Sequence, residues 1–388
     1  MRLQLILPRV EPEKIIAPKK CADEECGSTH VEFLQEVEKP IRDTVYDQVK
    51  AHRYGCLRCK GTQRVYPVGV SRAQTSLRVQ GLGVLLYLLG LSYGAVSLTL
   101  EALGVYLCKS RVYDIVQCVA ERVPGLKRGE VFKRIKTPAL AGDITSVRCN
   151  GEWLPLGLTV DDTNGLVLTI DDLSAEDTET LKEWLEPIAT AVEAELLVTD
   201  DADAFKTVAD ELMLEHQVCK GHVKRNTEAL IESLMAPAAQ DADSSLSALG
   251  IAPQQAVADL KRLQELILKR QPEDEAELRT FHFRYLEATP PRKGEQASIA
   301  YRLRLLFLDR WNLWPRLTRY RTWQGPQGET VDGTNNGSER AIGWWIKERY
   351  RTMRGYKRPQ SALNISRLLA WAGNHLDRGG ADLALLIS

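Results

Sequence analysis

Three carboxylates in this chain stand in sequence contexts that suit metal-dependent chemistry. Asp143 lies in AGDITS, Asp200 in LLVTDDADAF and Glu339 in TNNGSERAIG. Two divalent cations bridged by three carboxylates can catalyse phosphoryl transfer, because one ion activates the attacking oxygen while the other stabilises the leaving oxygen. Mg²⁺ is a hard, octahedral ion that seeks oxygen ligands. We therefore predict that Asp143, Asp200 and Glu339 bind two Mg²⁺ ions, or Mn²⁺ in their place, and are the catalytic residues.

Neighbouring aspartates offer alternatives to the second acid. Asp143 follows an apolar strand start, where a lone carboxylate would be costly to bury without a cation. Asp201 is adjacent to Asp200, and residues at a strand's end alternate sides, so only one of the two can face the site. We favour Asp200, and we keep Asp161 and Asp162, at the end of the second strand, as weaker alternatives.

The elements that must position these acids follow a recognisable order. ALAGDITSVRC, EWLPLGLTVDD and GLVLTIDDL predict three strands, with hairpin turn signals between them. An amphipathic helix (Ser174 to Ala194), the strand AELLVTDD and a further helix (Ala204 to Leu214) come next. This order describes the first half of a ribonuclease-H-like fold. Its first and fourth strands are neighbours, which would bring Asp143 and Asp200 together.

Four of the eight cysteines form two short-spaced pairs near the start of the chain. Cys21 and Cys26 are about thirty residues from Cys56 and Cys59, and the sequence between the pairs suits a small hairpin (Val31 to Tyr54). Such pairs can converge on one tetrahedral ion, which supplies folding energy to a ribbon that lacks a core. We predict a structural Zn²⁺ site at Cys21, Cys26, Cys56 and Cys59.

The following segment predicts three short helices. A leucine-rich helix ends at Gly90, a second runs from a Ser92 cap to Gly104, and Ser110 can cap a third. Helix, glycine-containing turn and helix outline a helix-turn-helix, although a packing module without a DNA role has the same pattern. In the DNA-binding interpretation, the N-terminal end of the later helix offers Ser110, Arg111 and Tyr113 to a major groove.

Later in the chain, amphipathic helices interrupt the α/β pattern. They are expected at Pro253–Arg270, Asp274–Glu287 and Ala297–Tyr320, and we expect the tryptophans of this region to be core or packing residues, or, less favoured, to stack on an unpaired base. A basic helix (Ser338 to Met353) then follows. Its cations next to Glu339 predict contacts with DNA phosphates, by Arg340, Lys347, Arg351 and Arg354.

Charge is segregated along the chain, although the formal net charge is only −1. Residues 161–215 contain seventeen Asp and Glu against two Lys, whereas residues 340–358 contain seven Lys and Arg against one Glu. Local fields decide what docks where, so the net charge does not exclude a nucleic-acid partner. Neither a signal peptide nor a membrane span is predicted, and we expect a cytoplasmic, bacterial, nucleoid-associated protein with no membrane partner.

Three passages together resemble a bacterial insertion-sequence transposase of the DDE type: GDITSVRCNGEW, LLVTDDADAF with HQVCKGHVKRN, and DGTNNGSERAIGWWIKERYRTMRGYKR. The Cys-x-x-His signature is similar to that of transposases related to the Mutator group, in which a helical insertion separates the second and third acids. The resemblance implies that Asp143, Asp200 and Glu339 are the metal-binding triad. It also implies that Cys219, His222 and Asn336 lie at the periphery of the active site.

Cys219 and His222 could also be read as half of a zinc site. No matching pair lies nearby in the sequence, and their spacing places both on one helical face. From the sequence we favour packing or a DNA-phosphate contact over metal binding.

The predicted architecture is an α/β ribonuclease-H-like catalytic core interrupted by an all-α insertion and preceded by a zinc ribbon and a helix-turn-helix module. Its segments are 1–70 (zinc ribbon), 71–136 (helix-turn-helix), 137–226 (first part of the core), 227–328 (all-α insertion) and 329–388 (C-terminal part of the core).

The predicted function is binding of terminal inverted repeats, Mg²⁺-dependent cleavage and strand transfer into target DNA. The partner is double-stranded DNA, and at least a homodimer is expected because two ends must be held together. Two other functions stay open: a sequence-specific DNA-binding protein with a degenerate core, and a structure-specific nuclease without strand transfer.

Overall fold

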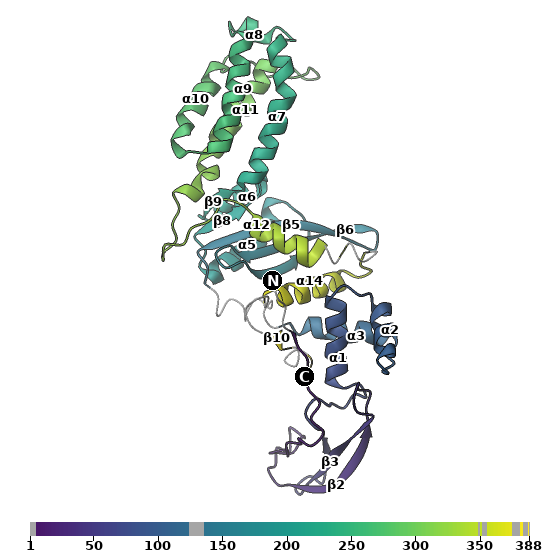
Figure 1. Cartoon of the computed structure of the whole chain (residues 1–388). Helices are drawn as coiled ribbons and strands as arrows, with labels where there is room; N and C mark the ends of the chain where they lie inside the picture. Colours follow the sequence, from purple (N-terminus) through teal and green to yellow (C-terminus); the bar gives the residue numbers. More distant parts are fainter. Residues whose placement is uncertain are drawn as a thin grey trace. The chain divides into compact units, whose positions relative to one another are not determined.

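The computed structural model describes residues 5–123, 136–347, 350, 355–374, 381–382 and 387. The chain divides into two compact units. Unit 1 comprises Met1–Glu130, Ser146–Leu154 and Ala341–Ser388, and unit 2 comprises Val131–Thr145 and Pro155–Arg340. Figure 1 shows the elements of both. Within the described ranges, no helix is long and apolar enough to cross a membrane.

A three-stranded antiparallel ribbon forms the N-terminal part of unit 1. Its strands are β2 (Val31–Pro40), β3 (Gln48–Cys56) and β4 (Thr62–Val65), in the order β2-β3-β4. Val37 pairs with Ala51, so the predicted hairpin is confirmed. The ribbon's own apolar cluster is small, namely Val10, Ile41, Val49 and Val70. A short parallel pair, β1 (Leu5–Ile6) and β10 (Ala381–Asp382), also belongs to unit 1.

Unit 1 also contains the helices α1 (Leu77–Leu88), α2 (Tyr93–Ala102), α3 (Lys109–Glu121) and α14 (Pro359–Asn374). Ser92 caps α2 as predicted, because its side chain accepts the Ala95 N–H. The predicted Ser110 cap is wrong: the N-cap of α3 is Cys108, two residues earlier, and the helix begins at Lys109. The Ser110 hydroxyl instead lies 3.3 Å from the Cys108 sulfur, inside the first turn.

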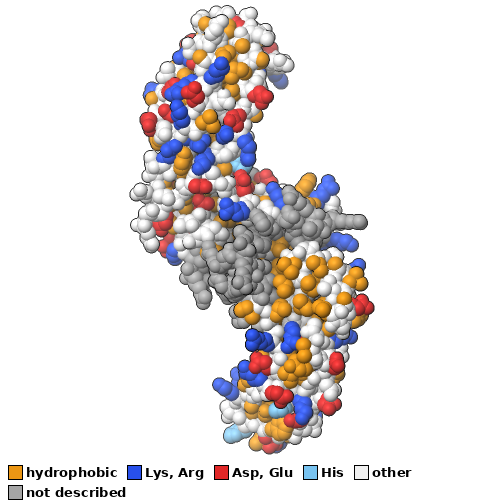
Figure 2. Space-filling view, in the orientation of Figure 1, with side chains coloured by type: hydrophobic (Ala, Val, Ile, Leu, Met, Phe, Trp, Pro, Cys, Tyr) orange, Lys and Arg blue, Asp and Glu red, His pale blue; other side chains and the backbone are white. Residues whose placement is uncertain are grey.

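Several apolar side chains of this helical part are exposed. Figure 2 shows hydrophobic side chains gathered over it. More than half of the surface of each of four of them faces solvent, namely Leu89, Leu98, Leu103 and Tyr106.

A five-stranded mixed sheet is the centre of unit 2. Its order is β7-β6-β5-β8-β9, and β8 is parallel to both β5 and β9. The first and fourth strands of the core, β5 and β8, are therefore neighbours, as predicted. The fifth strand, β9, was not predicted. The bounds are β5 (Ala139–Cys149), β6 (Glu152–Asp161), β7 (Leu166–Asp172), β8 (Leu196–Thr199) and β9 (Glu215–Val218).

Helices α5 (Thr178–Val192) and α6 (Asp203–Glu211) bury apolar side chains together with those of the sheet. Trp184 of α5 lies against Gly157 of β6, where a Cβ atom would be only 2.7 Å from the indole ring. The Trp184 indole N–H donates to Asp171 Oδ2 at 3.1 Å. The same hydrophobic core includes the buried side chains of Leu140, Leu185, Ile188 and Leu197.

The all-helical insertion has a hydrophobic core of its own, which includes the fully buried Trp314 and Phe307. Figure 1 shows its long helices side by side. The predicted helices here are confirmed. The helix expected at His222, α7, runs on to Gln240 and so crosses the predicted boundary between residues 226 and 227. The elements are α7 (Lys220–Gln240), α8 (Ser245–Ala248), α9 (Pro253–Lys269), η2 (Pro272–Asp274), α10 (Glu275–Arg284), α11 (Ile299–Leu317) and η3 (Arg319–Arg321).

The predicted basic helix is not one regular α-helix. It begins as α12 (Asn336–Ala341) and continues as a π-helical segment, η4 (Ile342–Lys347). Wider π winding breaks the spacing of three, four and seven residues on which the expected single basic face depends. Two of the predicted phosphate-contacting residues, Arg351 and Arg354, lie outside the described residues.

Candidate functional site

Asp143 lies in β5, and Asp200 directly follows the end of its parallel neighbour, β8. Ala141 of β5 pairs with Val198 of β8, and each aspartate follows two residues later in its strand direction. Both side chains are half-buried. Because parallel neighbours advance at the same rise per residue, the register places the two carboxylates at the same edge of the sheet.

A buried hydrogen-bond network holds the backbone at Asp200. The Thr199 hydroxyl donates to the Asp200 carbonyl at 2.9 Å and lies 2.9 Å from His216 Nε2. Arg316 reaches the other ring nitrogen, Nδ1, at 3.0 Å. Since a guanidinium can only donate, Nδ1 accepts and Nε2 carries the proton. Burial, aided by Arg316 and Lys206, lowers the pKa of His216 to about 3, so the ring is neutral.

The environment of Asp201 differs from that of Asp200. Lys206 Nζ lies 2.8 Å from Asp201 Oδ1, and Arg310 lies 3.7 Å from the other carboxylate oxygen. Arg310 is only 3% exposed, so Asp201 compensates a buried cation. Asp200 Oδ1 instead accepts the Ala202 N–H at 3.1 Å. Among the described residues Asp201 thus pairs with two cationic side chains, whereas Asp200 pairs with none.

Asp161 and Asp162 also have distinct surroundings. Asp161 is fully buried and accepts hydrogen bonds from the Thr137 hydroxyl and from Asn164, which closes the β6–β7 turn. Asp162 lies near α12, because a Cβ at Gly337 would be 3.4 Å from its Oδ1. Burial first, and then the charges of Asp332 and Asp161, raise the pKa of Asp162 to about 7.

The segment that leads into α12 is anchored to the strand ends by Asn335. Its side-chain amide donates to the Gly142 carbonyl at 3.4 Å, and its backbone N–H donates to the Cys219 sulfur at 3.3 Å. The Cys219 N–H in turn donates to the Thr199 carbonyl at 2.8 Å. Gly142 and Thr199 directly precede the two aspartates, so these bonds set the start of the helix that carries Glu339 beside both strands.

Glu339 lies next to the Cys-x-x-His signature. Its Oε1 is 3.5 Å from His222 Nδ1, and one ligand atom each of Cys219, His222 and Glu339 lies within 4.8 Å of the others. Among the described residues, no grouping at that spacing unites Glu339 with Asp143 and Asp200. The structure therefore places the two aspartates on adjacent strands and the glutamate beside His222.

Sequence reasoning missed three contributors to this site. It singled out Asn336, which is exposed, whereas Asn335 is buried and makes the anchoring contacts. It also gave no role to His216 or Arg316. Two consecutive asparagines at a helix start do indicate that a side-chain amide makes hydrogen bonds there. Which of the two faces the protein interior depends on how the helix is rotated about its axis.

The predicted DNA-contacting residues differ in exposure. Arg340 and Lys347 are exposed, as are Ser110 and Arg111 at the start of α3. Tyr113 has partners within unit 1: its hydroxyl lies 2.9 Å from that of Ser361, and its ring packs edge-on against Tyr93.

The four N-terminal cysteines converge as the sequence predicts. Cys21 and Cys59 are 3.7 Å apart at their sulfurs, as are Cys26 and Cys56, and all four sulfurs lie within 4.8 Å of one another. A tetrahedral ion with Zn–S bonds of about 2.3 Å requires sulfurs roughly 3.8 Å apart, so the cluster fits zinc. Hydrogen bonds from backbone N–H groups, foremost that of Cys59, lower the pKa of Cys56 to about 6.

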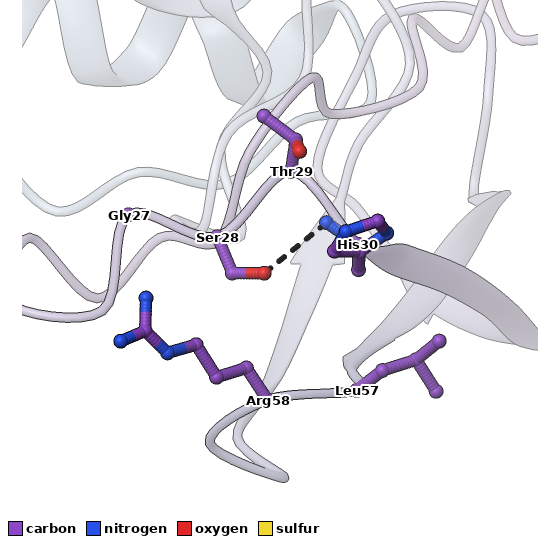
Figure 3. Close-up of a pocket in the computed structure, with 6 residues that line it drawn as sticks. All are labelled: Gly27, Ser28, Thr29, His30, Leu57 and Arg58. Atoms are coloured by element: carbon purple, nitrogen blue, oxygen red, sulfur yellow. Dashed lines mark hydrogen bonds between the residues drawn. The ribbon is translucent and has the colours of Figure 1, made fainter.

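A shallow pocket lies beside this cysteine cluster, between its two loops. Figure 3 shows Ser28 and His30 on one side and Leu57 and Arg58 on the other. The Ser28 hydroxyl accepts the His30 backbone N–H at 3.2 Å. Both Arg58 and His30 are exposed, so this side of the ribbon offers nitrogen donors to solvent.

No family model matches the chain, and no curated protein is similar to it. Solved structures with some similarity include the HTLV-2 integrase catalytic core domain in complex with magnesium. Its dimeric form has a TM-score of 0.19 and 20% identity, covering 33% of this chain and 85% of that one. The trimeric form has a TM-score of 0.19 and 19% identity, covering 33% and 84%. A simian T-cell lymphotropic virus intasome in complex with PP2A regulatory subunit B56 gamma has a TM-score of 0.20 and 20% identity, covering 37% and 58%.

Proposed function

We propose that this chain is a DNA transposase whose ribonuclease-H-like core cleaves transposon ends and joins them to target DNA. The observation that supports the proposal is the register of β5 and β8, in which Asp143 and Asp200 each follow a paired residue by two positions, together with the contacts of Asn335 that connect the segment before α12 to Gly142 and Cys219. Asp143, Asp200 and Glu339 are then the catalytic residues.

The donor chemistry of the two aspartates supports a hard divalent cation. Among the described residues Asp200 forms no ion pair with a lysine or arginine, whereas the adjacent Asp201 pairs with Lys206 and Arg310. Mg²⁺ at such carboxylates supplies activation of the attacking oxygen and stabilisation of the leaving oxygen. Asp143 and Asp200 would hold it from the strands, and Glu339 would join them on leaving His222.

Residues outside the acidic site would bind the DNA ends. The cysteine cluster would hold a structural Zn²⁺ in the ribbon. Ser110 and Arg111 are exposed in the first turn of α3, which is where a recognition helix contacts the bases. Arg340 and Lys347 supply exposed cations after Glu339 for phosphates of the cut strand. Because two ends must be held together, the active form would be at least a homodimer on double-stranded DNA.

An excision assay in cells tests this function. A marker is placed between the DNA segments that flank the gene in its native location, and the wild type is compared with Glu339→Gln. The matched control is Glu228→Gln, which makes the same change at a partly exposed position of α7 that pairs with Lys224. We expect excision by the wild type and by the control, and none by Glu339→Gln.

The other outcomes each contradict part of the proposal. Equal excision by Glu339→Gln would show that the third acid is misplaced. If no protein excises the marker but the wild type still binds the flanking DNA, the chain is a DNA-binding protein rather than a transposase. Cutting of branched DNA irrespective of the end sequence, with no joined product, would indicate a structure-specific nuclease.

A further inference from the structure

The Cys-x-x-His signature and Glu339 form a cluster with three different donor atoms. A thiol sulfur, an imidazole nitrogen and a carboxylate oxygen lie within 4.8 Å of one another. The sequence alone offered only half of such a site, because Cys219 and His222 have no matching pair nearby in the chain. The fold supplies the third donor from α12, 117 positions beyond His222.

The local structure orients these donors toward one another. Cys219 is the N-cap of α7 and His222 lies in its first turn, so three positions separate them along one helical face. The Cys219 sulfur is buried and accepts the Asn335 N–H at 3.3 Å. His222 Nδ1 is buried, has no hydrogen-bond partner and lies 3.5 Å from Glu339 Oε1.

A buried ring nitrogen without a hydrogen bond is costly, and a cation between it and the carboxylate would satisfy both. We propose that Cys219, His222 and Glu339 bind one Zn²⁺ ion, with a fourth position left open. Zn²⁺ takes sulfur, nitrogen and oxygen ligands at four-coordinate sites, whereas Mg²⁺ takes oxygen and keeps its waters. The site therefore selects zinc over magnesium.

Occupancy of this site has a consequence that rests on the proposed function. A zinc ion bound to Glu339 keeps that carboxylate beside His222 and apart from Asp143 and Asp200. The zinc-bound chain is then a resting state, in which the third acid is withheld from the magnesium site.

The zinc content of the full-length protein tests the site directly. The chain is reconstituted with Zn²⁺ under reducing conditions in excess Mg²⁺, freed of loose metal, and its bound zinc is measured. We expect about two ions per wild-type chain, one in each cysteine-containing cluster. Cys219→Ala and His222→Gln should each retain about one. Cys118→Ala, which removes an exposed cysteine of α3, should retain both ions.

A complementary variant identifies which ion is lost. Cys56→Ser removes a ligand of the ribbon cluster and should also leave about one ion, which the added Cys219→Ala change then removes. Circular dichroism of each variant checks that it is folded, and Co²⁺ in place of Zn²⁺ gives a thiolate charge-transfer band that Cys219→Ala weakens.

One ion on the wild type, or two ions on both Cys219→Ala and His222→Gln, would overturn the proposal. These results are independent of excision. A chain that never excises but binds a second zinc ion at Cys219 would contradict the proposed function alone. A chain whose excision needs Glu339 but which binds only the ribbon ion would contradict the zinc site alone.

Discussion

The backbone N–H of Asn335 donates to the Cys219 sulfur at 3.3 Å, across 116 positions of sequence. Cys219 caps α7 and its own N–H bonds to the end of β8, so the bond ties the segment before α12 to the sheet. The same asparagine also reaches the Gly142 carbonyl of β5. One buried residue thus connects the strands of both aspartates with the helix of Glu339.

Replacement of Asn335 should impair excision more than it impairs folding. Asn335→Ala removes the contact with Gly142 and leaves α12 less firmly placed, and a displacement of about 1 Å at a reacting group can reduce the rate by roughly a hundredfold. Loss of one buried hydrogen bond costs about 1–2 kcal/mol of stability. The excision assay and urea unfolding measure the two effects. Asn226→Ala, at an exposed position of α7, is the control and should change neither.

Asp200 and Asp201 should respond differently to the same substitution. Asp200→Asn should abolish excision with little change in stability, because the Ala202 N–H keeps an acceptor. Asp201→Asn should destabilise the protein by about 1–3 kcal/mol, because it leaves Arg310 with Asp309 as its remaining carboxylate partner. If Asp201→Asn abolished excision in a fully stable protein, and Asp200→Asn did not, the second acid would be Asp201.

Elements with strong local signals could be predicted from the sequence. Alternating apolar residues and turn signals gave the strands that carry Asp143 and Asp200, and their neighbour relation follows from a known strand order. Paired cysteines predicted the cluster at Cys21, Cys26, Cys56 and Cys59. In both cases the local pattern predicts the element or the ligand pair, and a common rule of pairing supplies the long-range partner.

Features that depend on distant contacts could not be predicted. Whether Asn335 or Asn336 faces inward depends on how α12 sits on the strand ends. The position of Glu339 beside His222 requires two segments far apart in the chain to meet. Ser110 has the intrinsic preference of a cap, but the helix begins at Lys109 and the hydroxyl turns to Cys108.

Removal of zinc should unfold the ribbon while unit 2 persists. The ribbon has only a small apolar cluster, so the metal would supply much of its folding energy. Cys56→Ser, or treatment with a strong chelator, should make residues 20–65 sensitive to limited proteolysis. Because protons compete with zinc for the four cysteine sulfurs, acidification should release the ion and expose the same residues to the protease. A ribbon that resists protease after complete zinc removal would contradict this dependence.

The contact between Trp184 and Gly157 should make Gly157→Ala destabilising. A Cβ at this position would be 2.7 Å from the indole, and the ring cannot retreat without losing its hydrogen bond to Asp171. Overpacking of this kind costs about 1–3 kcal/mol. Urea unfolding of Gly157→Ala measures the cost, and Gly343→Ala, where a Cβ meets nothing within 4 Å, is the control. Equal stability of the two variants would show that the sheet adjusts freely beneath α5.

Asp162 should make unit 2 less stable at alkaline pH than at mildly acidic pH. Its pKa rises from 3.8 in the unfolded chain to about 7 in the folded one, chiefly through burial. The folded state therefore holds the proton more tightly, and the slope of stability with pH is negative between about 4 and 7. Above pH 7 the carboxylate is ionised in both states and the full penalty is present. Below about pH 4 it is protonated in both states, and the penalty vanishes.

Asp162→Asn isolates this effect because the amide cannot ionise. We expect the variant to be more stable than the wild type at pH 8, by on the order of 2 kcal/mol, and the difference to disappear near pH 4. His216 has the opposite effect on the stability profile: because folding lowers its pKa, the protein loses stability as the pH falls below about 6.5. Since both proteins contain His216, this contribution cancels when they are compared. The difference between the two urea-unfolding profiles therefore reports Asp162 alone. Asp172→Asn, at an exposed position of β7, should leave the profile unchanged, and a stability gain of Asp162→Asn that did not vary with pH would contradict the raised pKa.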